Sequence, residues 1–194
     1  MTSLNIFTKC PYTGNPKSRM QSFLTDKERT FISKYMLLNI LQEVTKLNGI
    51  SINLWVYPKY KHPFFQEIQS KYKINLVEQI GNSLNHRMQN CIASQSKKFK
   101  KIILIGSDIP SLTYDIIELT INFLDKNDYV IGPSRDGGFY LLAKNNFNNK
   151  SIDMLQDIGN SFSSIQRTLD EKQINYKILP KLKDIDTKED LLFI

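Results

Sequence analysis

The 194-residue sequence has few of the residues around which small secreted domains and zinc proteins are organised. Its two cysteines, Cys10 and Cys91, lie far apart and form no CxxC pair, which excludes a disulfide scaffold as the organising device. Together with only two histidines, they are too few to build a Cys/His zinc site. The simplest interpretation is two idle thiols in a reducing cytoplasm.

Long apolar runs and an N-terminal leader are also lacking. The most apolar stretch, residues 102–106, is far too short to cross a membrane. The first seven residues contain no basic region followed by a long apolar run, so they do not resemble a signal peptide. We therefore expect a soluble cytoplasmic protein with no membrane partner.

The common glycine-based and hydrolase motifs are missing as well. The eight glycines form no GxGxxG, which leaves a Rossmann dinucleotide site without support. Residues 14–18 end like a P-loop but lack its first glycine at the required spacing. No nucleophile elbow accompanies the histidines, so nothing supports a Ser-His-Asp hydrolase.

The composition instead predicts one domain, residues 1–194, with one sizeable core, because 41% of the residues are hydrophobic. The net charge of +7 suits an anionic ligand, although lysine-rich coding produces the same excess without any function. The basic residues are scattered and form no stripe with aromatic residues, so we expect no nucleic-acid partner.

Short apolar runs alternate with longer amphipathic stretches, which predicts an α/β fold with a mostly parallel sheet and helices on both faces. We expect strands at residues 4–7, 50–57, 74–77, 101–105, 129–131, 139–143 and 176–179. We expect helices at residues 26–47, 63–71, 84–99, 113–124, 152–155, 162–169 and 187–193, with Thr113 as an N-cap. The core-facing residues predicted for the first helix are Phe31, Tyr35, Leu38, Leu41 and Val44.

Ligands in such folds sit beyond the carboxyl ends of the strands, so the loops there carry the candidate residues. The loop after the first strand places Lys9, Lys17 and Arg19 near Gly14 on a path stiffened by two prolines. These cations could hold a diphosphate, or they could belong to a solvated basic loop. The sequence of the loop alone supports the two interpretations equally.

Two further loops follow later strands. Gly106 and Asp108 follow the run at residues 101–105, whose continuous apolar character predicts a central strand. Asp108 is a candidate ligand of a hard cation, or else a turn or capping residue. In residues 132–138, Asp136 and the glycines after it form a tight-turn pattern, or a glycine-lined wall against substrate.

Two other segments also have structural explanations. Asp186 and Glu189, three residues apart, fit a capping box at a helix start, while Asp184 or Asp186 could still face a metal. Arg87 adds a cation at the start of the helix expected from residue 84, where a surface arginine is the default.

Five segments, in order along nearly the whole chain, resemble the motifs of one family. Residues 9–20 resemble K-x-P-x-x-G-x-x-K-T-R-L, and residues 79–88 echo Q-x-x-G-x-L-G-x-R-M. The other three motifs are I-G-S-D-x-P at residues 105–110, G-P-x-x-D-G-G-Y-Y-L at residues 132–141 and D-V-D-T-x-x-D-L at residues 184–191. The chain thus resembles the radical-SAM/selenodomain-associated small transferases of the GT-A nucleotide-diphospho-sugar transferase superfamily.

This resemblance implies a three-layer α/β/α sandwich that binds a nucleotide diphosphate through Mg²⁺ or Mn²⁺. Asp108 would correspond to the metal-binding aspartate, with Asp186, or else Asp184, as the second carboxylate. The residues that we expect to bind the nucleotide and its phosphates are Lys9, Gly14, Lys17, Arg19, Arg87 and Gly106.

Our main expectation is a metal-dependent glycosyltransferase with a nucleotide-sugar donor and a small acceptor. Asp136 is the candidate catalytic residue, and Gly137 and Gly138 would lie beside the acceptor. One alternative is a nucleotidyltransferase of the phospholactate guanylyltransferase type, which would release pyrophosphate. Another is a non-catalytic nucleotide- or RNA-binding protein. The sequence leaves the base, the sugar, the acceptor and the oligomeric state open.

Overall fold

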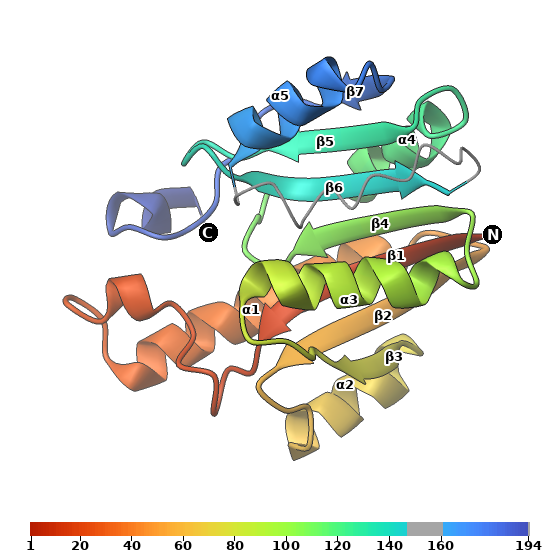
Figure 1. Ribbon diagram of the computed structural model, residues 1–194. Coiled ribbons are helices and arrows are strands. Elements are labelled where there is room, and N and C mark those ends of the chain that lie inside the picture. Colours follow the sequence, from red (N-terminus) through yellow and green to blue (C-terminus); the bar gives the residue numbers. More distant parts are fainter. Residues whose placement is uncertain (147–160, 194) are drawn as a thin grey trace.

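The computed structural model of the protein describes residues 1–146 and 161–193. Within them, the strands form one seven-stranded mixed sheet in the order β3-β2-β1-β4-β6-β5-β7 (Figure 1). The strands are β1 (Thr2–Lys9), β2 (Ile50–Tyr57), β3 (Asn75–Glu78), β4 (Lys101–Gly106), β5 (Tyr129–Pro133), β6 (Phe139–Asn145) and β7 (Tyr176–Ile178). β6 runs antiparallel to β4 and β5, while the other strand pairs are parallel.

Helices cover both faces of this sheet (Figure 1). They are α1 (Asp26–Val44), α2 (Pro63–Tyr72), α3 (Leu84–Ser96), α4 (Tyr114–Phe123) and α5 (Phe162–Glu171), with short 3₁₀ helices η1 (Ser18–Met20) and η2 (Glu189–Phe193). One buried cluster joins the sheet to α1, α2 and α4 through Leu37, Phe65 and Ile117. A second joins the opposite face to α3 and α5 through Cys91 and Ile165. The predicted α/β/α sandwich is therefore confirmed.

The helices begin where their capping residues allow. The side chain of Thr25 accepts a hydrogen bond from the backbone N–H of Glu28, whose carboxylate bonds back to the Thr25 backbone, a complete capping box. Ser83 and Ser161 cap α3 and α5 in the simpler way, with one side-chain hydrogen bond each. Thr113 occupies the predicted N-cap position of α4, although its side chain makes no capping hydrogen bond.

The buried face of α1 differs from the predicted one. Phe31 is 69% exposed and Tyr35 is 41% exposed, whereas the other three predicted residues pack in or against the core. The inward face includes the polar Arg29 and Ser33 together with Leu37. Because buried polar residues interrupt the apolar repeat, the hydrophobic spacing alone assigned Phe31 and Tyr35 to the wrong side.

Beyond β7, the chain runs along the carboxyl ends of β5 and β4. Residues 182–190, here called the C-terminal segment, first follow the end of β5, where the Leu182 N–H donates to the Pro133 carbonyl at 3.1 Å. They then cross the end of β4, where the Ile185 N–H donates to the Asp108 carbonyl at 3.3 Å. The side chain of Ile185 packs with Met20, so this segment lies against residues 10–20, here called the first loop.

Two remaining predictions concern the last helices. The helix predicted at residues 152–155 lies outside the described residues. The helix predicted at residues 187–193 is the 3₁₀ helix η2. Among the described helices, none combines the length and the apolar character that crossing a bilayer requires.

Candidate active site

The first loop holds an unusual backbone path. Asn15 and Lys17 both adopt left-handed conformations, with φ of 44° and 51°. The guanidinium of Arg29, from α1, donates to the Asn15 side-chain oxygen at 2.6 Å and to the Pro16 carbonyl at 2.9 Å. Non-glycine residues keep this conformation only where their surroundings stabilise it, and the two hydrogen bonds from Arg29 stabilise it here. No local sequence pattern indicated a role for Arg29, because its partners are set by the tertiary fold.

The ammonium of Lys17 joins the two predicted metal ligands. Its Nζ lies 2.9 Å from Asp108 Oδ2 and 3.6 Å from Asp186 Oδ1, and it donates to the Ile185 carbonyl at 2.7 Å. The Lys17 side chain is 3% exposed. Asp186 also accepts a hydrogen bond from Arg19 at 2.6 Å, and that arginine side chain is 70% exposed. The fold therefore brings these four predicted residues together.

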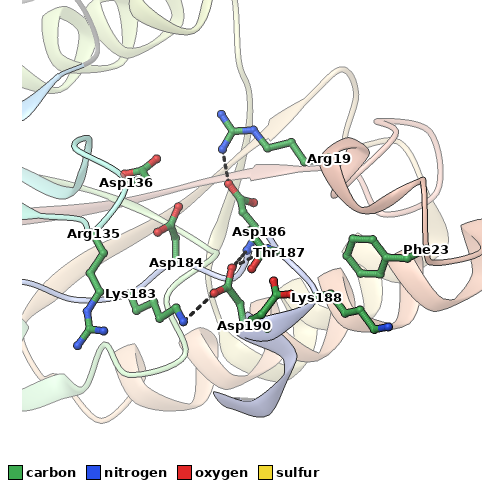
Figure 2. A pocket seen from close by; sticks show the side chains of 11 residues that line it. Arg19, Phe23, Arg135, Asp136, Lys183, Asp184, Asp186, Thr187, Lys188 and Asp190 are labelled. Carbon is green, nitrogen blue, oxygen red and sulfur yellow. Dashed lines mark hydrogen bonds and ion pairs between the residues drawn. The ribbon is translucent and has the colours of Figure 1, made fainter.

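A pocket of about 560 Å³ opens between the first loop and the C-terminal segment (Figure 2). The side chains of Asp136 and Asp184 lie near each other on one side of it, and Arg19 and Phe23 lie on the other (Figure 2). Both positively and negatively charged side chains line the pocket. The cationic lining residues are Arg19, Arg135, Lys183 and Lys188, and the acidic ones are Asp136, Asp184, Asp186, Glu189 and Asp190.

Asp136 and Asp184 differ in their electrostatic environments. Burial favours a higher pKa for Asp136, but hydrogen bonds from the Ser134 hydroxyl and the Gly138 N–H outweigh it and lower the pKa. Burial raises the pKa of Asp184, and the neighbouring Asp136 and Asp186 carboxylates raise it further. A lowered pKa makes Asp136 a weak proton acceptor. Its catalytic role stays a prediction.

Asp190 organises the turn that carries Asp186. One of its carboxylate oxygens accepts from the backbone N–H groups of Asp186 at 2.9 Å and Thr187 at 2.6 Å. The other oxygen lies 2.8 Å from the Lys183 ammonium, and the Asp190 side chain is only 8% exposed. The predicted capping box of Asp186 with Glu189 is therefore wrong, because the carboxylate that satisfies this turn is one residue further along.

The predicted glycines serve different purposes. A Cβ at Gly14 would lie 2.7 Å from the Cys10 carbonyl oxygen, so this glycine allows the loop backbone to pack closely. A Cβ at Gly106 would meet nothing within 4 Å, which leaves room for a ligand above the end of β4. Gly137, at φ of 91°, also faces open space, and Gly138 donates its N–H to Asp136 in the same turn. The tight-turn interpretation of this segment is thus correct.

The other predicted cations lie at neighbouring strand ends. Lys9 is exposed at the last position of β1. The Arg87 guanidinium lies 4.0 Å from the centre of the Tyr57 ring, and its Nε donates to the Gln79 side chain at 3.1 Å. Arg87 is thus fixed beside the ends of β2 and β3, and the fold places it outside the lining of the pocket.

The predicted carboxylate pair has the donor chemistry that a hard divalent cation prefers. Asp108, 51% exposed, and Asp186, 26% exposed, both supply carboxylate oxygens. Residues 1–146 and 161–193 contain no cluster of three or more His, Cys, Asp or Glu side chains suited to a metal. A Mg²⁺ or Mn²⁺ ion here would need water and substrate phosphates as its remaining ligands, which is usual for Mg²⁺.

The fold is similar to that of nucleotide-diphospho-sugar transferase-like proteins. A structure described as a candidate nucleotide-diphospho-sugar transferase of Desulfovibrio desulfuricans G20 matches with a TM-score of 0.86 at 21% identity, covering 98% of this chain and 84% of that one. The 4-diphosphocytidyl-2C-methyl-D-erythritol synthase of Anaerococcus prevotii matches with a TM-score of 0.67 at 14% identity, covering 100% and 93%. These likenesses show the fold alone.

The chain belongs to the family described as "Uncharacterized protein conserved in bacteria (DUF2064)", whose model matches residues 40–161. It is also 28% identical over 179 residues to the 2-phospho-L-lactate guanylyltransferase of Methanocaldococcus vulcanius, covering 90% of this chain and 76% of the relative. The Methanocaldococcus infernus enzyme of the same name is 27% identical, covering 92% and 78%. These relatives support the nucleotidyltransferase alternative better than the expected glycosyltransferase, and none bears on a radical-SAM association.

Proposed function

We propose that the protein is a nucleotidyltransferase that uses a nucleoside triphosphate and a small phosphorylated acid. The observation that carries this proposal is the similarity to guanylyltransferases across 90% of the chain. An acceptor phosphate oxygen attacks the α-phosphorus, the bond to the β-phosphate oxygen breaks, and pyrophosphate leaves. The relatives' names make guanine the first base to test and 2-phospho-L-lactate the first acceptor.

The arrangement of charge around the pocket is compatible with this reaction. Negative charge builds on the departing pyrophosphate, and positioned cations stabilise it. Arg19 and Lys9 are the exposed cations at the end of β1 and in the loop that follows it. A divalent cation, when bound, neutralises phosphate charge, and Asp108 and Asp186 are the residues that would hold it.

A phosphate acceptor also removes the need for a general base. A phosphate monoester has a second pKa of about 6, so its attacking oxygen is largely ionised at neutral pH. This agrees with the lowered pKa of Asp136, which makes it poorly suited to take a proton. In this proposal Asp136 shapes the turn at residues 134–138, whereas a sugar hydroxyl acceptor would require a base.

Product analysis tests the proposal directly. The protein is incubated with Mn²⁺, each nucleoside triphosphate and a panel of phospho-acids, and the nucleotides and pyrophosphate are quantified by chromatography. We expect pyrophosphate and a nucleotidylated acceptor in equal amounts. Release of a nucleoside diphosphate from a nucleotide-sugar would instead support glycosyl transfer. No turnover with any donor would support a non-catalytic nucleotide-binding protein.

Asp108→Asn tests whether the proposed site performs this chemistry. The amide keeps the shape of the side chain but removes the charge that would hold the cation, so we expect turnover to fall at least a hundredfold. Asp115→Asn, at an exposed position on α4, is the matched control and should leave turnover unchanged. Equal activity of the two variants would mean that Asp108 does not take part in the reaction.

A further inference from the structure

The ammonium of Lys17 is buried and already surrounded by oxygen atoms of the protein. An ammonium group carries three N–H donors. Three oxygens surround Lys17 Nζ: the Ile185 carbonyl at 2.7 Å, Asp108 at 2.9 Å and Asp186 at 3.6 Å. With the side chain 3% exposed, a phosphate could reach the ammonium only by displacing one of these partners.

Several features outside the ammonium fix its position. Lys17 has a left-handed backbone, and Arg29 holds the preceding residue through the Pro16 carbonyl. Met20, at the end of the same loop, packs against Ile185, the residue whose carbonyl accepts from Lys17. The backbone conformation and the apolar packing thus both place the Lys17 side chain between Asp108 and Asp186, which indicates a dedicated role and not a chance ion pair.

We propose that Lys17 is a positioning residue and not a phosphate ligand: its buried ammonium holds Asp108 and Asp186 as a preformed pair and competes with a divalent cation for them. The proposal rests on the proposed function in one respect, since this pair is the one that would hold the cation there. In the nucleotide-free protein the Lys17 ammonium partly neutralises the two carboxylates. A divalent cation can bind both carboxylates only when the ammonium moves away from them.

The physical argument concerns charge at short range. A positive charge about 3–4 Å from a carboxylate lowers the affinity of that carboxylate for any second cation, even where the effective dielectric constant is near 20. Replacing Lys17 with the uncharged Met keeps an apolar stem of similar length. Asp108 then loses its lysine partner and Asp186 keeps only Arg19, so the affinity of the pair for a divalent cation should rise about tenfold or more.

Manganese binding to the nucleotide-free protein tests this prediction. Free Mn²⁺ is measured by electron paramagnetic resonance during titration of the wild-type protein, Lys17→Met and the control Lys27→Met, whose lysine is exposed on α1. We expect about tenfold tighter binding by Lys17→Met and no change in Lys27→Met. Adding Asp108→Asn to Lys17→Met should remove the gain. A folded Lys17→Met, verified by circular dichroism, with wild-type or weaker Mn²⁺ affinity would overturn the proposal.

A second measurement needs no variant and remains decisive if Lys17→Met does not fold. The wild-type protein is acylated briefly with an amine-reactive ester, and modification of each lysine is quantified by mass spectrometry. Lys17 should be protected in the free protein and should react several-fold faster at saturating Mn²⁺, with Lys27 unchanged. A Lys17 reactivity that Mn²⁺ does not alter would contradict the competition. Neither measurement involves turnover, so failure to release pyrophosphate would count against the proposed function alone.

Discussion

The first loop and the C-terminal segment face each other across the pocket but are anchored by opposite charges. The first loop is held by two buried cations, Lys17 within it and Arg29 from α1, and it leaves Arg19 exposed. The C-terminal segment is held by the buried carboxylate of Asp190. In both regions one charged residue stabilises the backbone while another of the same sign lines the pocket. Burial, and not residue type, therefore distinguishes the charges that hold the backbone from the more exposed charges around the pocket.

The largest loss of stability is expected from Asp190→Ala. The substitution removes the acceptor of two backbone N–H groups and the carboxylate that contacts the Lys183 ammonium, which should cost about 3 kcal/mol in the free energy of unfolding. Urea denaturation measures the change. Glu189→Ala, at an exposed position on the same turn, should change stability by less than about 0.5 kcal/mol. Similar losses in the two variants would mean that Asp190 is not the anchor.

The same residue predicts an acid dependence. Burial alone would raise the pKa of Asp190, but its bonds to Lys183 and to the backbone N–H groups outweigh burial and hold the pKa far below the ordinary value. Its stabilising contribution is thus complete above about pH 4, the unfolded pKa, and declines as the pH falls toward the folded pKa. Wild-type and Asp190→Ala stabilities should converge below pH 4. A constant difference down to pH 2 would contradict this assignment.

The next largest loss of stability is expected from Gly14→Ala, and Gly106→Ala should have a smaller effect. Gly14→Ala places a Cβ 2.7 Å from the Cys10 carbonyl oxygen, and the resulting strain should cost about 2 kcal/mol. Gly106→Ala meets open space and should change stability by less than about 1 kcal/mol. Thermal unfolding compares them. If Gly106→Ala proved the more destabilising, the space above β4 would not be open.

Arg29→Met should have a smaller effect, about 1–2 kcal/mol. It removes the hydrogen bonds to Asn15 and Pro16 but also removes the cost of burying a guanidinium. The effect should be local. Hydrogen exchange of the backbone amides, followed by mass spectrometry, should become faster in the first loop and stay unchanged in α4. Lys27→Met is the control. Unchanged exchange in the loop would show that Arg29 does not hold it.

Arg19→Ala should barely affect stability, because exposed ion pairs contribute at most about 1 kcal/mol. Its effect should appear in binding. A charge-assisted bond to phosphate is worth about 1.5–3 kcal/mol, so nucleoside triphosphate affinity should fall about tenfold or more. Calorimetric titration with the triphosphate and with the nucleoside distinguishes the roles. Equal loss for both ligands would place Arg19 outside the phosphate site.

The sequence predicted the layers of the fold well because they depend on local pattern. The apolar run at residues 101–105 became β4, and the alternation of strands and helices gave the correct sandwich. Apart from the buried face of α1, the features that the sequence did not predict are contacts between distant segments. Lys17 pairs with a carbonyl 168 residues further along the chain, and no local pattern distinguishes it from the exposed Arg19. Asp190 was missed for a related reason, since the fold decides which carboxylate faces the turn.

The most direct test of the proposed reaction follows the label of a nucleoside triphosphate. GTP labelled at the α-phosphorus or at the γ-phosphorus is incubated with the protein, Mn²⁺ and a phospho-acid acceptor such as 2-phospho-L-lactate. Nucleotidyl transfer predicts that the α-label moves into the acceptor product and that the γ-label leaves as pyrophosphate. Appearance of the γ-label as inorganic phosphate, or no movement of the α-label with any acceptor while a nucleotide-sugar is cleaved, would contradict the account.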